Sequence, residues 1–188
     1  WINWESLPDG YRDDLKPIWE QYGLFTLSGS RGRLGGGKKD LSMLFVYVAA
    51  DRYLDVGGRI GYVITQTVLK TQGAGDGFRK FSYMSESPKG GTHFRPVIAH
   101  DLSRMQVFED ATNRTAVLVL QKEERGFRYP VPYVLWAGAG RVAQELSLEE
   151  VQDKTHRIEM QASPVQPLKR NSPWLTLPPE ALPGAIKA

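Results

Sequence analysis

The sequence has no cysteine, three histidines and no long apolar run. Because cysteine is absent, disulfides and Cys-ligated zinc or iron–sulfur centres are excluded. The longest unbroken apolar stretch, residues 43–50, is far too short to cross a bilayer. The opening residues show neither the basic segment nor the apolar core of a secretory leader. We therefore expect a cytoplasmic protein that does not use a membrane as a partner.

The few histidines also argue against a metal centre. His93 and His100 are seven residues apart in a stretch that we expect to be extended, so their side chains face opposite sides. His156 lies far along the chain, and no HExxH pattern is present. No serine occupies the G-x-S-x-G pattern of hydrolases. The sequence thus predicts no metal and gives little support to covalent catalysis.

Charge is abundant but unevenly spread. The 24 lysines and arginines outnumber the 21 aspartates and glutamates, giving a net charge of +3. Residues 30–104 hold twelve bases and six acids, a surplus of +6. A basic centre suits a polyanionic partner, because Lys and Arg that approach phosphates release counterions. A solvated charged surface gives the same pattern, so charge alone leaves both interpretations open.

The first half of the chain contains the signals of a helix followed by a strand. Residues 11–22 favour a short helix, into which Pro17 fits poorly. Asp40 is a good N-cap for a second helix that ends at Gly57 and Gly58. One mostly apolar face of this helix is predicted to hold Leu41, Leu44, Phe45, Val48 and Arg52. The β-rich residues 59–65 then predict a strand, which makes one half of an α/β unit.

The second half predicts an antiparallel pair of strands. A short helix is expected near residues 75–84, followed by strands at 92–102 and 114–122. No helix separates these strands, so they would close an otherwise α/β sheet as an antiparallel hairpin. From residue 163 onward the chain holds six of its twelve prolines, which favours a linker or the entrance to another domain.

Two motifs match known patterns incompletely. Residues 32–39 fit the G-x-x-x-x-G-K pattern of phosphate-binding loops, but Lys39 stands where a magnesium-binding hydroxyl is needed. A basic surface loop, either touching phosphates or simply solvated, fits this stretch better. Residues 171–174, NSPW, approach the Asn-Pro-Pro-aromatic tetrapeptide of amino-methyltransferases, but Ser172 replaces the first proline. We therefore interpret this tetrapeptide as a decoy.

Two longer blocks resemble a known family. Residues 40–81, DLSMLF through GGRIGYVI to FRKF, and residues 100–122, HDLSRMQVFEDATNRTAVLVLQK, are similar to successive blocks of large bacterial DNA adenine-N6 methyltransferases. These enzymes occur in fused restriction–modification proteins and phage-defence systems. The resemblance implies an α/β, partial Rossmann-like class I methyltransferase fold with a terminal antiparallel hairpin. Residues 1–125 would be the C-terminal half of the catalytic domain, and residues 126–188 a linker and the start of a target-recognition region.

The resemblance also implies how the chain begins. In this family a Trp-Ile or Tyr-Ile segment directly follows Asn-Pro-Pro, so Trp1 is similar to the aromatic of that tetrapeptide. The parent enzyme would transfer a methyl group from S-adenosylmethionine to adenine N6. Its Asn-Pro-Pro and the Gly-rich loop that grips the cofactor are absent from this sequence, so we expect the fragment to be inactive alone. Cytosine N4 remains an open alternative acceptor, since the decisive tetrapeptide is missing.

The family comparison implies roles for particular side chains. Trp1 and Phe108 would stack on the flipped target base, and Phe45 would lie near the adenine of the cofactor. Core packing is the alternative for Phe108 and for Phe45, and a disordered terminus is the alternative for Trp1. The basic residues expected to contact DNA are Arg31, Arg33, Lys38, Lys39, Arg79 and Lys80.

The expected partners follow from these assignments. They are double-stranded DNA and the missing N-terminal half of the same protein, with self-association through an exposed sheet edge as a further expectation. The rival interpretation is a non-catalytic nucleic-acid-binding module, for which the basic residues 30–104 are the main support.

Overall fold

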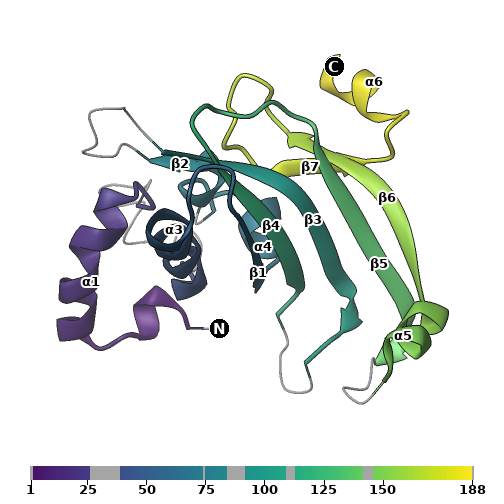
Figure 1. The fold of residues 1–188 in the computed structure, drawn as a ribbon, viewed down its shortest axis with the longest axis horizontal. Coiled ribbons are helices and arrows are strands. Elements are labelled where there is room, and N and C mark those ends of the chain that lie inside the picture. The colour runs from purple at the N-terminus through teal and green to yellow at the C-terminus, as the bar shows by residue number, and fades with distance from the viewer. Residues whose placement is uncertain are drawn as a thin grey trace.

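A computed structural model describes residues 2–25, 39–73, 75–83, 92–108, 113–141 and 146–187. Helices and strands alternate in its first half, and strands predominate in its second (Figure 1). The elements are η1 (Trp4–Ser6), α1 (Asp9–Gln21), α3 (Leu41–Tyr53), β1 (Arg59–Thr65), α4 (Thr67–Lys70), η2 (Phe78–Lys80), β2 (Ser82–Tyr83), β3 (Thr92–Gln106), β4 (Thr115–Glu123), β5 (Val131–Arg141), α5 (Leu148–Lys154), β6 (Thr155–Pro164), β7 (Trp174–Leu177) and α6 (Leu182–Lys187).

The strands form one open, mostly antiparallel sheet of seven strands in the order β1-β4-β3-β5-β6-β7, with β2 paired to β3. β4 lies between β1 and β3 and is antiparallel to both, so β1 and β3 run in the same direction. This confirms the predicted antiparallel pairing of β3 with β4. The one parallel pair, β3 with β5, joins this part of the sheet to the rest among the described strands.

Side-chain alternation explains why one face of the sheet carries the core. In β4, Ala116, Leu118 and Leu120 are fully buried, whereas Val117 and Val119 between them are only partly buried. A strand presents alternate residues to opposite faces, so the first three face the helices and the other two face outward. Figure 1 shows α1 and α3 beside the β1 end of the sheet, with α5 and α6 at opposite ends of the later strands.

α3 begins as predicted and buries Leu41 and Leu44 of the predicted face, but it leaves Phe45 exposed. The Asp40 carboxylate accepts a hydrogen bond from the Ser42 amide at 2.8 Å, which confirms the N-cap. The buried residues of α3 are Leu41, Ser42, Met43, Leu44, Val46, Tyr47 and Ala50. Phe45 instead points away from the core and is 49% exposed. Because this helix is apolar on nearly all sides, packing against the sheet selects the buried face, and local periodicity does not.

Two predicted helices differ in extent. α1 runs through Pro17 without a break, and Trp19 beyond it is fully buried against the rings of Trp4 and Phe25. The helix expected near residues 75–84 is only the 3₁₀ turn η2 in its described part. A Cβ added to Gly77 would lie 2.6 Å from the carbonyl oxygen of Leu24. This close approach to another segment explains the glycine, which is a poor helix former.

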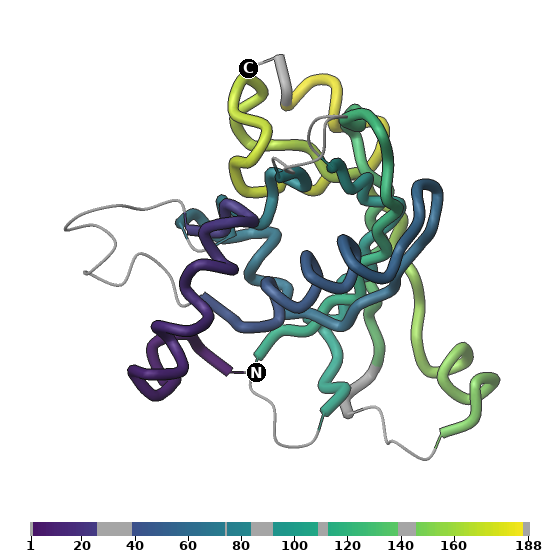
Figure 2. Tube along the Cα trace, turned by 60° about the vertical axis from the view of Figure 1, so that its left-hand side comes forward, coloured from purple at the N-terminus to yellow at the C-terminus, as the bar shows by residue number. Residues whose placement is uncertain are grey.

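The strands beyond residue 125, β5, β6 and β7, belong to the same sheet as the earlier strands. Val131, Tyr133, Ala162 and Trp174 belong to the same buried cluster as Phe94. The predicted boundary at residue 125 falls between β4 and β5, yet strand pairing continues across it through β3 and β5. In Figure 2 the yellow C-terminal segment lies at the top of the molecule. In the part of the chain that the structure describes, no helix has the length and hydropathy needed to traverse a bilayer.

Candidate functional site

The ends of β1 and β3 define the first candidate site. Because these two strands are parallel to each other, their carboxyl ends lie at the same edge of the sheet. The Gln66 amide, directly after β1, donates to the Arg114 carbonyl at 2.8 Å, so the start of β4 lies at this edge too. We call this region the carboxyl edge. In open α/β sheets ligands bind where such strand ends meet.

The N-terminal segment reaches the start of α3 near the same edge. The Leu41 amide donates to the Ile2 carbonyl at 2.9 Å, and the Trp4 amide donates to the Lys39 carbonyl at 2.7 Å. Burial, and secondarily the charge of Asp40 at the start of α3, raises the pKa of Tyr62 in β1. The N-terminal residues, the start of α3 and β1 are therefore neighbours. Trp1 itself lies outside the described residues.

A buried polar cluster stands behind the carboxyl edge. Asp101 in β3 is 4% exposed, and its carboxylate accepts hydrogen bonds from the Gln66 side chain at 3.1 Å and the Ser103 amide at 2.8 Å. The Tyr133 hydroxyl of β5 also donates to it. Burial, together with the charge of Asp101 and this hydrogen bond, raises the pKa of Tyr133. With its oxygens already engaged, Asp101 fixes the end of β1 against β3 and β5 and is poorly placed to act as a free base.

Lys70 completes this cluster from α4. Its ammonium lies 4.8 Å from the centroid of the Tyr133 ring and within hydrogen-bond distance, 2.5 Å, of the Thr176 hydroxyl oxygen. Burial lowers the pKa of Lys70 to about 8, although the charge of Asp101 opposes this change. Lys70 therefore joins α4 at the carboxyl edge to β7 through a partly desolvated cation.

Two of the three aromatic residues assigned by resemblance, Phe45 and Phe108, lie in the described part of the chain and are exposed. Phe108, two residues beyond β3, is 43% exposed, and Phe45 on α3 is 49% exposed. The alternative that either ring packs in the core is therefore wrong. Phe108 follows β3 at the carboxyl edge, whereas Phe45 lies on the outer side of α3. A solvent-facing ring at each place is free to stack on a planar ligand.

The basic residues expected to contact DNA have different environments. Arg31, Arg33 and Lys38 lie outside the described residues. Lys39 is 7% exposed, and its ammonium lies 5.3 Å from the Phe25 ring, so it faces an aromatic group and is largely out of solvent. Lys80 is exposed and donates to the Gly23 carbonyl at 3.3 Å.

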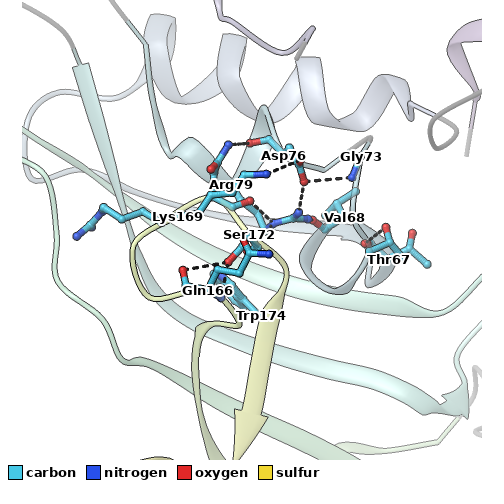
Figure 3. A network of polar contacts seen from close by, with 12 residues as sticks. Thr67, Val68, Gly73, Asp76, Arg79, Gln166, Lys169, Ser172 and Trp174 are labelled. Atoms are coloured by element: carbon cyan, nitrogen blue, oxygen red, sulfur yellow. Dashed lines mark hydrogen bonds and ion pairs between the residues drawn. The ribbon is translucent and has the colours of Figure 1, made fainter. Parts of the chain in front are cut away.

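Arg79 holds a structural position, which Figure 3 shows. It is 1% exposed, and its guanidinium is 2.6 Å from the Asp76 carboxylate. Its remaining nitrogens donate to the carbonyls of Val68 at 2.5 Å, Asn171 at 3.0 Å and Ser172 at 3.1 Å. Burial lowers the pKa of Arg79, and the charge of Asp76 opposes this. Arg79 would have to leave all these partners before it could meet a phosphate.

The NSPW segment lies at this same network, which we call the Arg79 clamp: Asp76, Arg79, Asn171 and Ser172. The Asn171 side chain donates to the Asp76 carbonyl at 3.0 Å, and the Ser172 hydroxyl accepts from the Gln166 amide at 3.0 Å. The clamp fixes the loop between β6 and β7 to the segment after α4. The tetrapeptide thus has a structural role in this protein.

Sequence reasoning missed the buried cluster and the clamp. The available signal was a set of polar residues, Gln66 and Asp101, within otherwise apolar strand segments. Which partners they would meet depends on the parallel pairing of β3 with β5, and no local sequence pattern predicts that pairing.

Comparison with models of known protein families gives no match, and comparison with curated protein sequences gives none. Among the described residues, no group of three or more histidine, aspartate or glutamate side chains is arranged to hold a metal ion.

Proposed function

We propose that this chain is the C-terminal part of the catalytic domain of a DNA adenine-N6 methyltransferase, with the start of its target-recognition region. The parent enzyme, of restriction–modification or phage-defence type, would transfer a methyl group from S-adenosylmethionine to the amine of an adenine in double-stranded DNA. A paired adenine hides this amine inside the duplex. The enzyme would therefore extrude the nucleotide, at a cost of a few kcal/mol, roughly.

The observation that carries the proposal is the reversed strand at one end of the sheet. β4 inserts antiparallel between the parallel strands β1 and β3. An antiparallel strand in this position supports the hairpin that a partial Rossmann-like class I methyltransferase fold implies. The strands that form it, β1, β3 and β4, carry much of the sequence resemblance. The Rossmann-like description is proposed for these strands and α3 alone.

The open side of β1 supports the proposal further. The Gln66 amide donates to Arg114, and the Lys122 amide donates to Gly58, so even-numbered positions of β1 face β4. The backbone groups of Gly61 and Val63 therefore point to the other side, where the described residues provide no further strand. In the parent enzyme, the half of the sheet that binds the cofactor would pair there.

Exposed aromatic residues would serve the two ligands. Phe108, at the carboxyl edge, would stack on the extruded base. Such stacking stabilises a bound base by about 1–3 kcal/mol. Phe45, on the outer side of α3, would contact the adenine of S-adenosylmethionine, whose sulfonium supplies the methyl group. Asp101 would act indirectly, by holding Gln66 and the end of β1 in place.

Substitution of Phe108 tests this assignment in the full-length protein. Phe108→Ala should reduce incorporation of labelled methyl groups into DNA by about tenfold or more, because the flipped base loses its stacking partner. The affinity for S-adenosylmethionine should be nearly unchanged. Tyr53→Ala, which removes a ring that is 82% exposed on α3, is the matched control and should leave methylation unaffected. Equal loss of methylation and cofactor binding would point to a structural role.

The coding sequence upstream of Trp1 separates the enzyme from the rival function. Asn-Pro-Pro immediately before Trp1, with a Gly-rich loop further upstream, would support the methyltransferase. Unrelated upstream sequence, together with DNA binding by this chain, would favour the non-catalytic nucleic-acid-binding module.

A further inference from the structure

A second set of polar and aromatic side chains lies on the outward face of β5 and β6. The side chains of Trp136, Gln152, Thr155, Arg157 and Glu159 line a hollow of about 510 Å³ there. The strand register places Trp136 opposite Arg157 and Val134 opposite Glu159. Tyr133 on β5 faces the core, so Trp136, three residues further, faces away from it. Figures 1 and 2 show α5, which contributes Gln152, projecting at this end of the β5–β6 pair.

The indole of Trp136 is held in a fixed orientation. Its Nε1–H donates to Nδ1 of His100 in β3 at 3.1 Å. This bond requires an unprotonated Nδ1, and burial together with the charge of Arg157 lowers the pKa of His100. The guanidinium carbon of Arg157 lies over the indole ring, 5.6 Å from its centroid. A half-buried aromatic surface is therefore already positioned beside a cation.

The groups around this ring have unused hydrogen-bonding capacity. In the part of the chain that the structure describes, the side chains of Gln152, Arg157 and Glu159 form no hydrogen bond or ion pair. The Thr155 hydroxyl already donates to the Val151 carbonyl at 2.6 Å. The hollow thus offers a planar apolar surface, a carboxylate that only accepts, a guanidinium that only donates and an amide that does both.

We propose that this hollow binds a nucleotide and prefers guanine. The base takes the place of the Arg157 guanidinium over Trp136, the Glu159 carboxylate accepts from guanine N1–H and the N2 amine, and the displaced Arg157 contacts the phosphate. Guanine presents these two donors side by side, matching the two carboxylate oxygens, whereas uracil presents a single ring N–H. The ligand is a free guanine nucleotide or an unpaired guanine in a single strand. This inference is independent of methyl transfer.

Calorimetric titration of the protein with GMP, AMP, CMP and UMP tests the preference. GMP should bind most tightly, and Trp136→Leu should abolish binding of all four, since stacking is common to every base. Glu159→Gln should weaken GMP binding about tenfold and remove most of its advantage over AMP. Glu149→Gln, in the exposed first turn of α5 and outside the hollow, is the matched control and should change nothing.

Titration with single-stranded oligonucleotides that contain one guanine shows whether the ligand is a free nucleotide or a nucleic acid. Tighter binding of the oligonucleotide than of GMP assigns the site to nucleic acid, and equal affinities assign it to free nucleotides. The proposal fails if neither ligand binds, if all four bases bind equally, or if Glu159→Gln leaves GMP affinity unchanged. Because Glu159 is a surface residue without hydrogen bonds to described residues, its substitution keeps the test valid even if Trp136→Leu unfolds.

Discussion

At the residue scale, Lys70 shows that a partly buried charge can oppose folding. Its folded-state pKa, about 8, is below the ordinary value of 10.5 because burial disfavours the ammonium. Between these values the folded state binds fewer protons than the unfolded state, so the contribution of Lys70 to stability rises with pH. Below about pH 8 the buried charge lowers the free energy of unfolding by a constant amount. Removing the charge while keeping the apolar stem should therefore stabilise the protein at neutral pH.

The variant Lys70→Met tests this. At pH 7 its free energy of unfolding should exceed that of the original protein by about 1 kcal/mol, since partial solvent access screens much of the burial penalty. The difference should shrink as the pH rises from about 8 to 10.5. Urea unfolding at several pH values provides the measurement. Lys154→Met, at an exposed lysine, is the control, and a less stable Lys70→Met at pH 7 would contradict the argument.

At the element scale, the Arg79 clamp makes the β6–β7 loop dependent on the segment after α4. Arg79→Lys keeps the charge but loses the planar fork, so at least one buried carbonyl should lose its partner. An unpaired buried acceptor costs about 1–3 kcal/mol. We expect a loss of about 2 kcal/mol in unfolding free energy. Amide exchange should accelerate at Gln166 and Ser172 before it does so in β4.

Arg95→Lys is the matched control for the clamp. Arg95 is 41% exposed in its side chain and pairs with Glu123 at 2.9 Å, so its replacement should cost less than about 1 kcal/mol. Equal destabilisation by both variants, or uniform acceleration of exchange, would show that Arg79 does not act through the loop.

The elements themselves show which parts of the fold are encoded locally. Asp40 marks the start of α3, and Gly57 and Gly58 mark the start of β1, but α3 ends at Tyr53, before the predicted glycines. The β-rich composition of β1 and β4 identifies both strands. The buried face of α3 and the strands after residue 125 could not be predicted. An all-round apolar helix has no single preferred face, and prolines obscured β6 and β7. The buried polar cluster could not be predicted either, because Asp101, Lys70 and Tyr133 come together only through the pairing of strands that are far apart in the sequence.

At the scale of the whole molecule, the free side of β1 predicts self-association. An exposed edge strand offers backbone donors and acceptors to a second copy, and Val63 in β1 is 43% exposed. Sedimentation velocity should give an average mass that rises with protein concentration. Val63→Lys should lower the association constant about tenfold, because two copies would bring like charges together. Val165→Lys, at a loop residue 53% exposed, should not.

The outcome that contradicts this prediction is a protein that stays monomeric at all concentrations and unfolds cooperatively. Such behaviour would mean that β1 tolerates an open edge. It would also weaken the proposal that another half of the sheet belongs there.

The Arg79 clamp has a consequence for how this protein can diversify. Arg79 binds main-chain oxygens of residues 171 and 172, which every amino acid carries. Mutations at these positions can therefore alter the chemical character of the loop while its anchorage to Arg79 persists. Related sequences could therefore carry different side chains on the β6–β7 loop while the contacts between Arg79 and the loop backbone stay the same.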